Sequence, residues 1–481
     1  MFTNIQAIIL AAGKSQRFKT NKTKMTEPIC GQPMILYQTT LLESLGVPMT
    51  IAVGHQKELL QKTINQLHAN INFSEQKEQK GTGDAVACTR EYWTHDYILI
   101  MNGDVPLITE DIIKELCSTH MQTGAAITFV TSHDDTPANG YGKVIKKDGH
   151  VEIVETKNLP DSLQEQCCIN AGIYMVNKDF LTRYIDQLTH NALTGEYYVT
   201  DLIKMASDHG FGVETITVPF DKVRGINTLE ELWAAEQVKR SQLIKYWMQN
   251  GVRFSIAQNV HIDLGVTIEP GSFIGSAVQL TGATKIGANV IINSFSLLHN
   301  AIVENGVTIK AHSVIEDSHI SADAQVGPFA YLRNNNQIGD DARIGAFVEL
   351  KNSKVGKGSR IKHLSYIGDA QIGAEVNVGG GTVTANHNGV SKNKTTIKDN
   401  AYIGANNSLV APVVIGKDAY TAAGSTITQE VPANALAIAR ARQVNKKEYA
   451  EKIKEKLQQA ELEKKKKANK SFVPATELEI T

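Results

Sequence analysis

The segment HIDLGVTIEPGSFIGSAVQLTGATKIGANVIINSFSLLHN, residues 261–300, repeats an aliphatic side chain at every sixth position. These positions are Ile262, Ile268, Ile274, Leu280, Ile286, Ile292 and Leu298. A sustained period of this kind is typical of a repeat fold, in which each short strand points one aliphatic side chain inward and stacks on its copy one coil away. The segment therefore predicts a parallel β-helix.

The period continues, with one-residue slips, as far as Ile415. It is interrupted between Val378 and Ile397, where the next aliphatic residue of the series comes after nineteen positions although eighteen would keep the phase. The centre of this interval is rich in Gly, Asn and Lys, which predicts a loop that leaves the coil. Repeat proteins commonly place functional residues on such loops.

The first half of the chain has a different pattern, in which short apolar runs alternate with amphipathic stretches. Examples of the runs are IQAIIL (5–10), MTIAVG (49–54) and YILIMNGD (97–104). Alternating strands and helices predict an α/β, Rossmann-like domain with a largely parallel sheet covered by helices. Residues 229–250 contain no Gly or Pro and predict a connecting helix. We therefore expect a first domain at 1–228, a linker helix at 229–250, a β-helix at 251–436 and a tail at 437–481.

Composition places few limits on function. The 481 residues carry a formal net charge of −1, which gives no overall bias toward nucleic acid or a membrane surface. No segment approaches the roughly eighteen apolar residues needed to span a bilayer, so we expect a cytoplasmic protein. The cysteines lack CxxC spacing, and we interpret them as reduced packing residues rather than metal ligands or disulfides. They are Cys30, Cys88, Cys117, Cys167 and Cys168.

The tail is rich in lysine. Residues 439–470 contain twelve Lys and Arg against five Glu. This composition is typical of a solvated helix that frays into a tail, and it also suits a basic arm near a polyanionic ligand. Both interpretations stay open at the level of sequence.

The loop LAAGKSQRF, residues 10–18, directly follows the first apolar run. Its small residues let backbone N–H groups approach phosphates closely, and Lys14 and Arg17 add positive charge, although a glycine turn after a strand can also be purely structural. The GKS within it is not a Walker A loop, because the residue five positions before Gly13 is Ile8. Asp104 ends another apolar run, which predicts a carboxylate at the carboxyl edge of the sheet, as a Mg²⁺ ligand or as a helix cap.

Several motifs occur in the order seen in sugar-1-phosphate nucleotidylyltransferases. They are LAAGKSQRF, Lys24, EQKGTGDA (78–85), NGDVPL (102–107), GYGKV (140–144), IVETKN (153–158), INAGIY (169–174), GEYYVTD (195–201) and GIN (225–227). Joined to hexapeptide repeats that include KHLSYIGDAQIG (362–373), they resemble a bifunctional bacterial family, the N-acetylglucosamine-1-phosphate uridyltransferase/glucosamine-1-phosphate acetyltransferases. The resemblance covers about residues 5–445.

This resemblance implies a left-handed β-helix and two reactions that make UDP-N-acetylglucosamine for cell-envelope precursors. Glucosamine 1-phosphate would be acetylated with acetyl-CoA, and UMP would then be transferred from UTP to N-acetylglucosamine 1-phosphate with release of pyrophosphate. The resemblance also implies Mg²⁺ as the metal and a homotrimer with acetyl-transfer sites between subunits.

For uridylyl transfer, the resemblance implies that Arg17 and Lys24 neutralise the triphosphate and that Asp104 and Asn227 hold Mg²⁺. The implied nucleotide and sugar contacts are Leu10, Ala11, Ala12, Gly13, Lys24, Gln76, Gly81, Thr82, Asn102, Gly103, Asp104, Gly142, Glu155, Asn170 and Asn227. These residue types suit the reaction, because two negatively charged phosphates must approach each other and cations must offset their repulsion.

His363 occupies neither inward position of its repeat, so its side chain should face outward. An outward histidine is most often a surface residue, but Glu349 and Lys351 lie on a nearby earlier coil, which suits a general base acting on a phosphorylated substrate. The resemblance implies that His363 takes the proton from the attacking amine and that Glu349 orients the imidazole. It implies sugar-phosphate contacts from Arg333, Lys351, Tyr366, Asn377, Asn386 and Lys392, and acetyl-CoA contacts from Gly380, His387, Ala405, Ala423 and Arg440.

Four positions depart from the family pattern. Thr23 stands where the family has proline before the lysine, and Ala171 stands where it has threonine after the asparagine. In the β-helix, His387 replaces tyrosine and Ala405 replaces serine. The changes at Thr23 and Ala171 remove no charged group, so we expect altered affinity more than lost activity there. The changes at His387 and Ala405 put some of the implied acetyl-CoA contacts in doubt but leave the base in place.

Two alternatives remain. A nucleotidylyltransferase whose β-helix only trimerises would have no need of His363 beside Glu349, or of a lysine on the loop. A non-enzymatic scaffold with the same layout could dispense with Arg17, Lys24 and Asp104, all of which are present.

Overall fold

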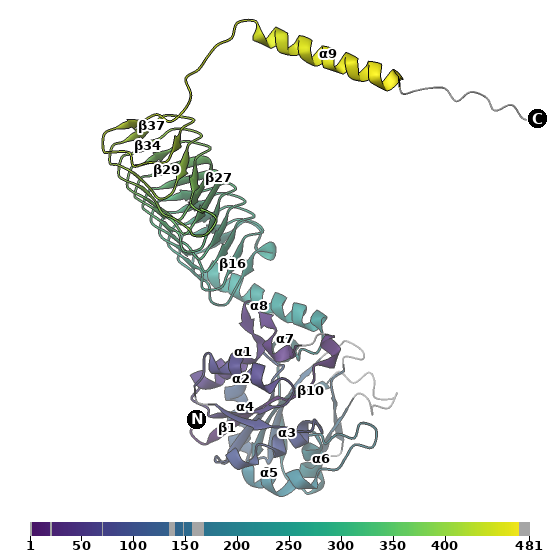
Figure 1. The fold of residues 1–481 in the computed structure, drawn as a ribbon. Coiled ribbons are helices and arrows are strands. Elements are labelled where there is room, and N and C mark those ends of the chain that lie inside the picture. Colours follow the sequence, from purple (N-terminus) through teal and green to yellow (C-terminus); the bar gives the residue numbers. More distant parts are fainter. Residues whose placement is uncertain are drawn as a thin grey trace, which may run out of the picture.

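The computed structural model describes residues 2–19, 22–69, 71–133, 140–147, 149–155 and 168–470. Figure 1 shows an α/β domain at the N-terminal end, then helix α8 (Leu229–Gln249), a rod of stacked strands, and helix α9 (Tyr449–Lys470) beyond the rod. Within these ranges, none of the helices has the length and apolar character that crossing a bilayer requires.

The N-terminal domain is built on a sheet with the strand order β11-β7-β10-β6-β1-β4-β5. The strands are β1 (Ile5–Ala11), β4 (Met49–Val53), β5 (Asn72–Glu75), β6 (Tyr97–Asn102), β7 (Ile127–His133), β10 (Cys168–Asn177) and β11 (Val213–Thr217). β1 runs parallel to β4 and β6, whereas β10 runs antiparallel to β6 and β7. A hairpin of β8 (Lys143–Lys147) and β9 (His150–Val154) pairs with β10. The predicted α/β fold is confirmed, with β10 as its antiparallel member.

Helices cover both faces of this sheet. They are α1 (Met34–Ser44), α2 (Lys57–Asn65), α3 (Thr82–Ala87), α4 (Glu110–Thr123), α5 (Lys178–Tyr184), α6 (Asp201–Asp208) and α7 (Phe220–Val223). Every residue of β1 is buried as a result. Ile5 and Ile9 pack into one apolar cluster and Ile8 into the other, as the two-residue period of a strand requires. The loop after β1 therefore starts from a rigidly held strand end.

Helix α8 joins the two domains. A capping box starts it: the Thr228 hydroxyl accepts a bond from Glu231 N at 3.1 Å, and Glu231 Oε2 accepts one from Thr228 N at 2.9 Å. Arg240, farther along the helix, lies 3.0 Å from His261 Nδ1 in the first coil of the rod. The capping box fixes where α8 begins at the end of the N-terminal domain. The contact of Arg240 with His261 holds one side of the helix against the first coil of the rod.

The described cysteines are free thiols, namely Cys30, Cys88, Cys117 and Cys168. Burial raises the pKa of Cys30 and of Cys117 to about 12, so both remain neutral. The interpretation as reduced packing residues is therefore supported for these four, while Cys167 lies outside the described residues.

The rod is a parallel β-helix. Its strands have two or three residues, from β12 (Arg253–Phe254) to β39 (Leu436–Ala437), apart from the longer β27 (Arg343–Lys351) and β29 (Arg360–Gly368). Each strand pairs with the equivalent strand one coil away, so that Ile274 lies opposite Ile292. The aliphatic residues of the period form one continuous buried core. The prediction of a β-helix from the six-residue period is confirmed.

The chain leaves the coil between β32 (Val383–Ala385) and β33 (Thr395–Ile397), inside the interval where a loop was predicted. Because of this excursion, Val378 pairs with Ile403 across a much longer stretch of chain than separates Ile274 from Ile292. Asn393 N donates to Asn386 O at 2.7 Å and closes the neck of the loop.

Candidate active sites

The loop after β1 lies at the carboxyl edge of the sheet and is tied to its neighbours by backbone bonds. Gly103 N donates to Leu10 O at 2.9 Å, and His55 N donates to Ala12 O at 3.2 Å. A Cβ on Gly103 would lie 2.9 Å from Leu10 O, so glycine permits this close approach. A Cβ on Gly13 would meet no atom within 4 Å. Packing does not demand glycine at 13, and the space beside it is open to a ligand.

Two cations and two oxygen ligands meet at the same edge. Lys24 Nζ lies 2.6 Å from Asp104 Oδ2 and 2.8 Å from Asn227 Oδ1. The Arg17 guanidinium donates to Asn227 Oδ1 at 2.7 Å. The side chains of Lys24 and Asp104 are only 11% and 16% exposed, so water screens their attraction weakly. Four predicted residues from distant parts of the sequence are thus brought into one cluster.

The oxygens of Asp104 and Asn227 suit Mg²⁺, which takes hard oxygen ligands and usually combines one or two protein ligands with substrate phosphates and water. Among the described residues, no group of three or more His, Cys, Asp or Glu is arranged to hold a metal ion. The donor set at this edge therefore fits a metal that is shared with a phosphorylated substrate.

Gln76, Gly81 and Thr82 lie together, with Thr82 as the first residue of α3. Gln76 Nε2 donates to Gly81 O at 2.9 Å and to Asp84 Oδ2 at 2.8 Å. Gly81 has a φ of +101°, and a Cβ there would lie 2.4 Å from Tyr197 O, so conformation and packing both require glycine. These contacts fix the turn in which the predicted nucleotide contacts sit.

Gly142, Glu155 and Asn170, the predicted sugar contacts, lie close to one another. Asn170 N donates to Gly142 O at 2.9 Å, and a Cβ on Gly142 would lie 3.4 Å from Glu155 Oε1. Glu155 Oε1 accepts a bond from the Thr200 hydroxyl at 3.1 Å. Both ends of the Asn170 side-chain amide are hydrogen-bonded within the protein. Its Nδ2 donates to the Tyr174 hydroxyl at 2.6 Å, and its Oδ1 accepts a bond from the backbone N–H of Gly172. Asn170 is therefore held in a fixed orientation.

Sequence reasoning missed residues that support this site. The Tyr141 hydroxyl accepts a bond from Gly225 N at 2.7 Å and so clamps the segment that carries Asn227. Glu231 Oε2 accepts a bond from Asn227 N at 2.6 Å. The capping pattern T-x-x-E at 228–231 is a signal for Glu231. Tyr141 lies within the motif GYGKV, but its partner is 84 positions away, so the motif alone does not reveal this contact.

On the β-helix, polar residues gather where β25 (Tyr331–Arg333), β27 and β29 stack. Lys351 lies opposite Arg333 on one side and opposite Gly368 on the other. A Cβ on Gly368 would lie 2.5 Å from the Tyr366 hydroxyl. The loop brings Lys392 to Lys351, and the pKa of Lys392 is lowered because its ammonium group meets a second one at hydrogen-bonding range. The cluster thus concentrates positive charge.

Asp369, which the sequence analysis left out, anchors this cluster. Its Oδ2 accepts a bond from Asn386 Nδ2 at 2.6 Å, and its Oδ1 accepts one from Asn352 Nδ2 at 2.7 Å. Burial alone would raise its pKa, but these bonds and the charges of Lys351 and Lys392 lower it. Asp369 belongs to the motif KHLSYIGDAQIG. A Gly-Asp pair at the corner of a repeat is typical of a turn, so the sequence did not indicate that its carboxylate holds the loop.

His363 is exposed on β29, and no hydrogen-bonding partner for its imidazole occurs among the described residues. Glu349 is paired with Arg333, whose Nε and terminal nitrogen donate to Glu349 Oε1 at 3.1 and 2.6 Å. The strand register places Glu349 opposite Tyr366, and Ala346 opposite His363. The predicted contact between Glu349 and the imidazole is not formed within this single chain and stays a prediction.

Small residues line the corner of the β-helix beside His363. A Cβ on Gly380 would lie 3.1 Å from the Cβ of His363. Asn406 N donates to Gly380 O at 2.7 Å, and Gly424 N donates to Ala405 O at 2.8 Å, which stacks successive corners. The predicted residues along this corner are His363, Gly380, Ala405 and Ala423, and a Cβ on Gly424 would lie 4.0 Å from Arg440 Cδ. Gly380, Ala405 and Ala423 therefore stack on successive coils along this corner, above His363.

Two predicted residues lie to the side of this corner. Asn377, in β31 (Asn377–Val378), pairs with Arg360 and Tyr402 on the neighbouring face. His387 is exposed in the loop and forms an antiparallel bridge with Lys392. The structure thus places His387 beside the lysine cluster rather than in the corner.

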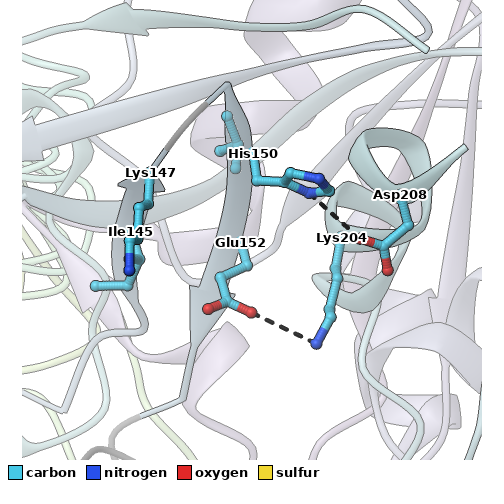
Figure 2. A pocket seen from close by; sticks show the side chains of 7 residues that line it. Ile145, Lys147, His150, Glu152, Lys204 and Asp208 are labelled. Carbon is cyan, nitrogen blue, oxygen red and sulfur yellow. Dashed lines mark ion pairs between the residues drawn. The ribbon is translucent and has the colours of Figure 1, made fainter. Parts of the chain in front are cut away.

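A shallow cavity of about 340 Å³ lies elsewhere in the N-terminal domain, between the β8–β9 hairpin and α6 (Figure 2). Ile145, Lys147, His150, Val151, Glu152, Lys204 and Asp208 line it. His150 Nδ1 lies 3.3 Å from Asp208 Oδ1, and Lys204 Nζ lies 3.6 Å from Glu152 Oε2. It contains none of the predicted site residues, and four of its polar groups already pair with one another.

Known proteins resemble both halves of the chain. The model of the MobA-like NTP transferase domain matches residues 7–187, that of the bacterial transferase hexapeptide (six repeats) matches 394–429, and that of the hexapeptide repeat of succinyl-transferase matches 284–311. The chain is 39% identical over 459 residues to the bifunctional protein GlmU of Brevibacillus brevis, covering 94% of this chain and 98% of that protein. It is 40% identical over 449 residues to that of Geotalea uraniireducens (92% and 98%) and 40% over 456 residues to that of Geobacillus thermodenitrificans (94% and 98%).

Proposed function

Because the chain belongs to the bifunctional GlmU family, we propose that its two clusters of side chains are the two active sites of one enzyme. The enzyme acetylates glucosamine 1-phosphate with acetyl-CoA and transfers UMP from UTP to the N-acetylated product, giving UDP-N-acetylglucosamine and pyrophosphate. The observation that carries this conclusion is the identity of 39 to 40% along nearly the whole length of the relatives, which covers the sheet domain and the left-handed β-helix alike.

At the sheet edge both reacting groups are phosphates, so catalysis consists mainly of positioning and of offsetting negative charge. The attacking oxygen belongs to the sugar phosphate, and no protein nucleophile is needed. We assign Lys24 and Arg17 to the charge of the departing pyrophosphate, which the shared contact of both cations with Asn227 supports. When bound by Asp104 and Asn227, Mg²⁺ supplies Lewis-acid polarisation of the phosphates.

In the β-helix site, the amine of glucosamine 1-phosphate attacks the thioester carbonyl of acetyl-CoA. A C–N bond forms, the C–S bond breaks, and coenzyme A leaves as the thiolate. The proton lost by the amine passes to His363, which then donates it to the sulfur and gives the thiol. The exposed imidazole, with no competing partner among the described residues, supports this role. Gly380 and Ala405 have no side chain beyond a methyl group, which favours binding of the extended arm of the coenzyme beside His363.

The sugar phosphate would bind at Lys351, Lys392 and Arg333. A dianion between the two lysines relieves the repulsion that lowers the pKa of Lys392. Glu349 holds the Arg333 guanidinium in place, and this contact raises the pKa of Arg333. Glu349 thus supports the phosphate end of the site, and its additional role toward His363 stays a prediction.

We also propose a homotrimer. One corner of the β-helix carries a ladder of parallel rings with centroids 5.0, 5.0 and 5.3 Å apart, formed by Phe295, His312, Phe329 and Phe347. The three phenylalanines remain 57%, 48% and 61% exposed in the single chain. Leu364, which is 66% exposed, follows His363 directly. A neighbouring copy packed on this apolar corner would cover it and bring its own side chains to His363.

The test measures thiol release from acetyl-CoA with glucosamine 1-phosphate, and pyrophosphate release from UTP with N-acetylglucosamine 1-phosphate. His363→Ala should lose about 10² to 10⁴ in acetyl transfer and keep pyrophosphate release. His319→Ala is a matched control, because His319 pairs with Glu304 on the surface of the same β-helix. If the wild type releases pyrophosphate but no thiol, the β-helix only trimerises, and His387 and Ala405 mark the lost activity.

A further inference from the structure

Helix α9 stands apart from both sites. It follows residues 438–448 at the far end of the β-helix, and Figure 1 shows it projecting away from the rod. Every residue whose side chain the structure describes in the helix, 449–468, is exposed. Residues 440–448 before it are exposed too. The helix is therefore presented to the surroundings on a stretch of chain that the rod does not bury.

The first half of the helix carries an apolar face. Tyr449, Ile453 and Leu457 are spaced four residues apart and so lie on one side, where they are 46%, 47% and 66% exposed. Ala450 and Ala460 fall on the same side. Amphipathic helices are mostly stabilised by burying such a face, yet nothing in the rod covers this one.

The charges of the helix are predominantly positive. Lysines stand at 452, 454, 456 and 464–467, and glutamates at 451, 455, 461 and 463. Lys464 and Lys467 continue the side that Ile453 and Leu457 occupy about two to four turns earlier. The four adjacent lysines repel one another, so this end of the helix gains from contact with a negatively charged surface.

We propose that α9 is a docking element for an anionic lipid bilayer. Tyr449, Ile453 and Leu457 enter the boundary between headgroups and acyl chains, and Lys464 and Lys467, which continue this side of the helix, lie against the lipid phosphates. A helix with one apolar face, flanking lysines and low overall hydrophobicity lies in the plane of such a surface. Each lysine near an anionic membrane strengthens binding roughly fivefold, so Lys464 and Lys467 together strengthen it about 25-fold.

Two other occupants fit the same residues less well. In a coiled coil between copies, the seam of Ile453 and Leu457 would run on into Lys464 and Lys467, whose charges would then face their counterparts. A nucleic acid would satisfy the lysines but would leave the apolar face uncovered. Only a surface that is both apolar and negatively charged matches both halves of the helix.

The experiment measures co-sedimentation of the full-length protein with vesicles of phosphatidylcholine alone and with vesicles that contain about one third phosphatidylglycerol. Leu457→Glu places a charge in the apolar face. Leu462→Glu makes the same change on roughly the opposite side of the helix, at a residue that is 57% exposed. Neither residue belongs to an active site, so both transfer activities should stay at the wild-type level.

We expect the wild type to bind the anionic vesicles and not the neutral ones, with binding that weakens as salt rises. Leu457→Glu should lose more than about tenfold in affinity and Leu462→Glu less than about threefold. The proposal is overturned if the wild type ignores anionic vesicles, or if the two variants lose binding equally, since the apolar face would then take no part. It is also overturned if an oligonucleotide displaces the protein fully from the vesicles and binds the wild type and Leu457→Glu with the same affinity.

Discussion

Replacing Lys24 with methionine tests whether the cluster at the sheet edge performs uridylyl transfer. The change removes one ammonium group and keeps most of the apolar stem. It breaks the contacts of Lys24 with Asp104 at 2.6 Å and with Asn227 at 2.8 Å. The Asp104 side chain is only 16% exposed, so its carboxylate loses a cation that little water can replace.

The expected magnitudes follow from this geometry. A hydrogen bond to a charged group contributes about 1.5–3 kcal/mol, and because the pair retains some contact with water we expect a loss of about 2 kcal/mol in the free energy of unfolding. For a domain of this size that loss corresponds to a Tm lower by about 4–8 °C. Removing one preorganised charge from the transition state should lower kcat for pyrophosphate release by about 10² to 10³.

The assay follows both transfers and the thermal unfolding of the first domain. Lys57→Met is the matched control, because Lys57 pairs with Glu75 at 2.7 Å in the same domain but on its surface. That variant should change stability by less than about 1 kcal/mol and neither activity. Lys24→Met should keep wild-type thiol release. The reasoning is refuted if pyrophosphate release survives in Lys24→Met, or if thiol release falls with it.

Three further outcomes are expected. Gly142→Ala places a Cβ 2.7 Å from Ile153 Cγ2 and should destabilise the first domain by about 1–3 kcal/mol while raising KM for the sugar phosphate; an unchanged KM would contradict this. Burial lowers the pKa of His120 to about 4, so stability is complete above the unfolded pKa near 6.5 and falls by up to about 3 kcal/mol as pH drops toward 4. Urea unfolding at pH 7 and at pH 4.5 should show that loss, and His120→Gln should remove most of it. An equimolar mixture of Lys24→Met and His363→Ala should convert glucosamine 1-phosphate to UDP-N-acetylglucosamine, which neither variant does alone; no product would mean that the intermediate does not pass between molecules.

The β-helix could be predicted from the sequence because one residue type at one period decides it. Each inward position, such as Ile274 or Ile292, must be aliphatic, and the pattern repeats often enough to exclude chance. The loop could be predicted for the same reason, since a break in the period shows where the chain leaves the coil. The antiparallel direction of β10 was not predicted. A buried strand is a continuous apolar run whichever way it is oriented, so its sequence does not indicate its direction.

The candidate sites were predictable only in part. Lys24, Asp104 and Asn227 could be named from their motifs, but their mutual contacts depend on a fold that closes gaps of 80 and 203 positions. Tyr141 and Asp369 lie within quoted motifs, but their role was not predictable because it depends on the distant residues that they hold in place. The pairing of Glu349 with Arg333 likewise follows from strand register, which motif spacing does not reveal.

The positive charges of the two proposed sites have different partners before any substrate binds, and this difference determines which contacts each substrate must change. In the uridylyl-transfer site that we propose, the Lys24 ammonium already contacts Asp104 and Asn227, so a bound nucleotide and Mg²⁺ would have to displace these contacts before the cation could act on phosphate. At the β-helix, Lys351 and Lys392 repel each other until an anion separates them. The first site therefore gains its active arrangement only with its substrate, which suits a step in which water must not attack UTP prematurely. In the acetyl-transfer site that we propose, the two lysines already lie together before the substrate binds, and the His363 imidazole has no hydrogen-bonding partner among the described residues. Its rate should therefore depend on how readily the two substrates bind rather than on forming new contacts between protein side chains.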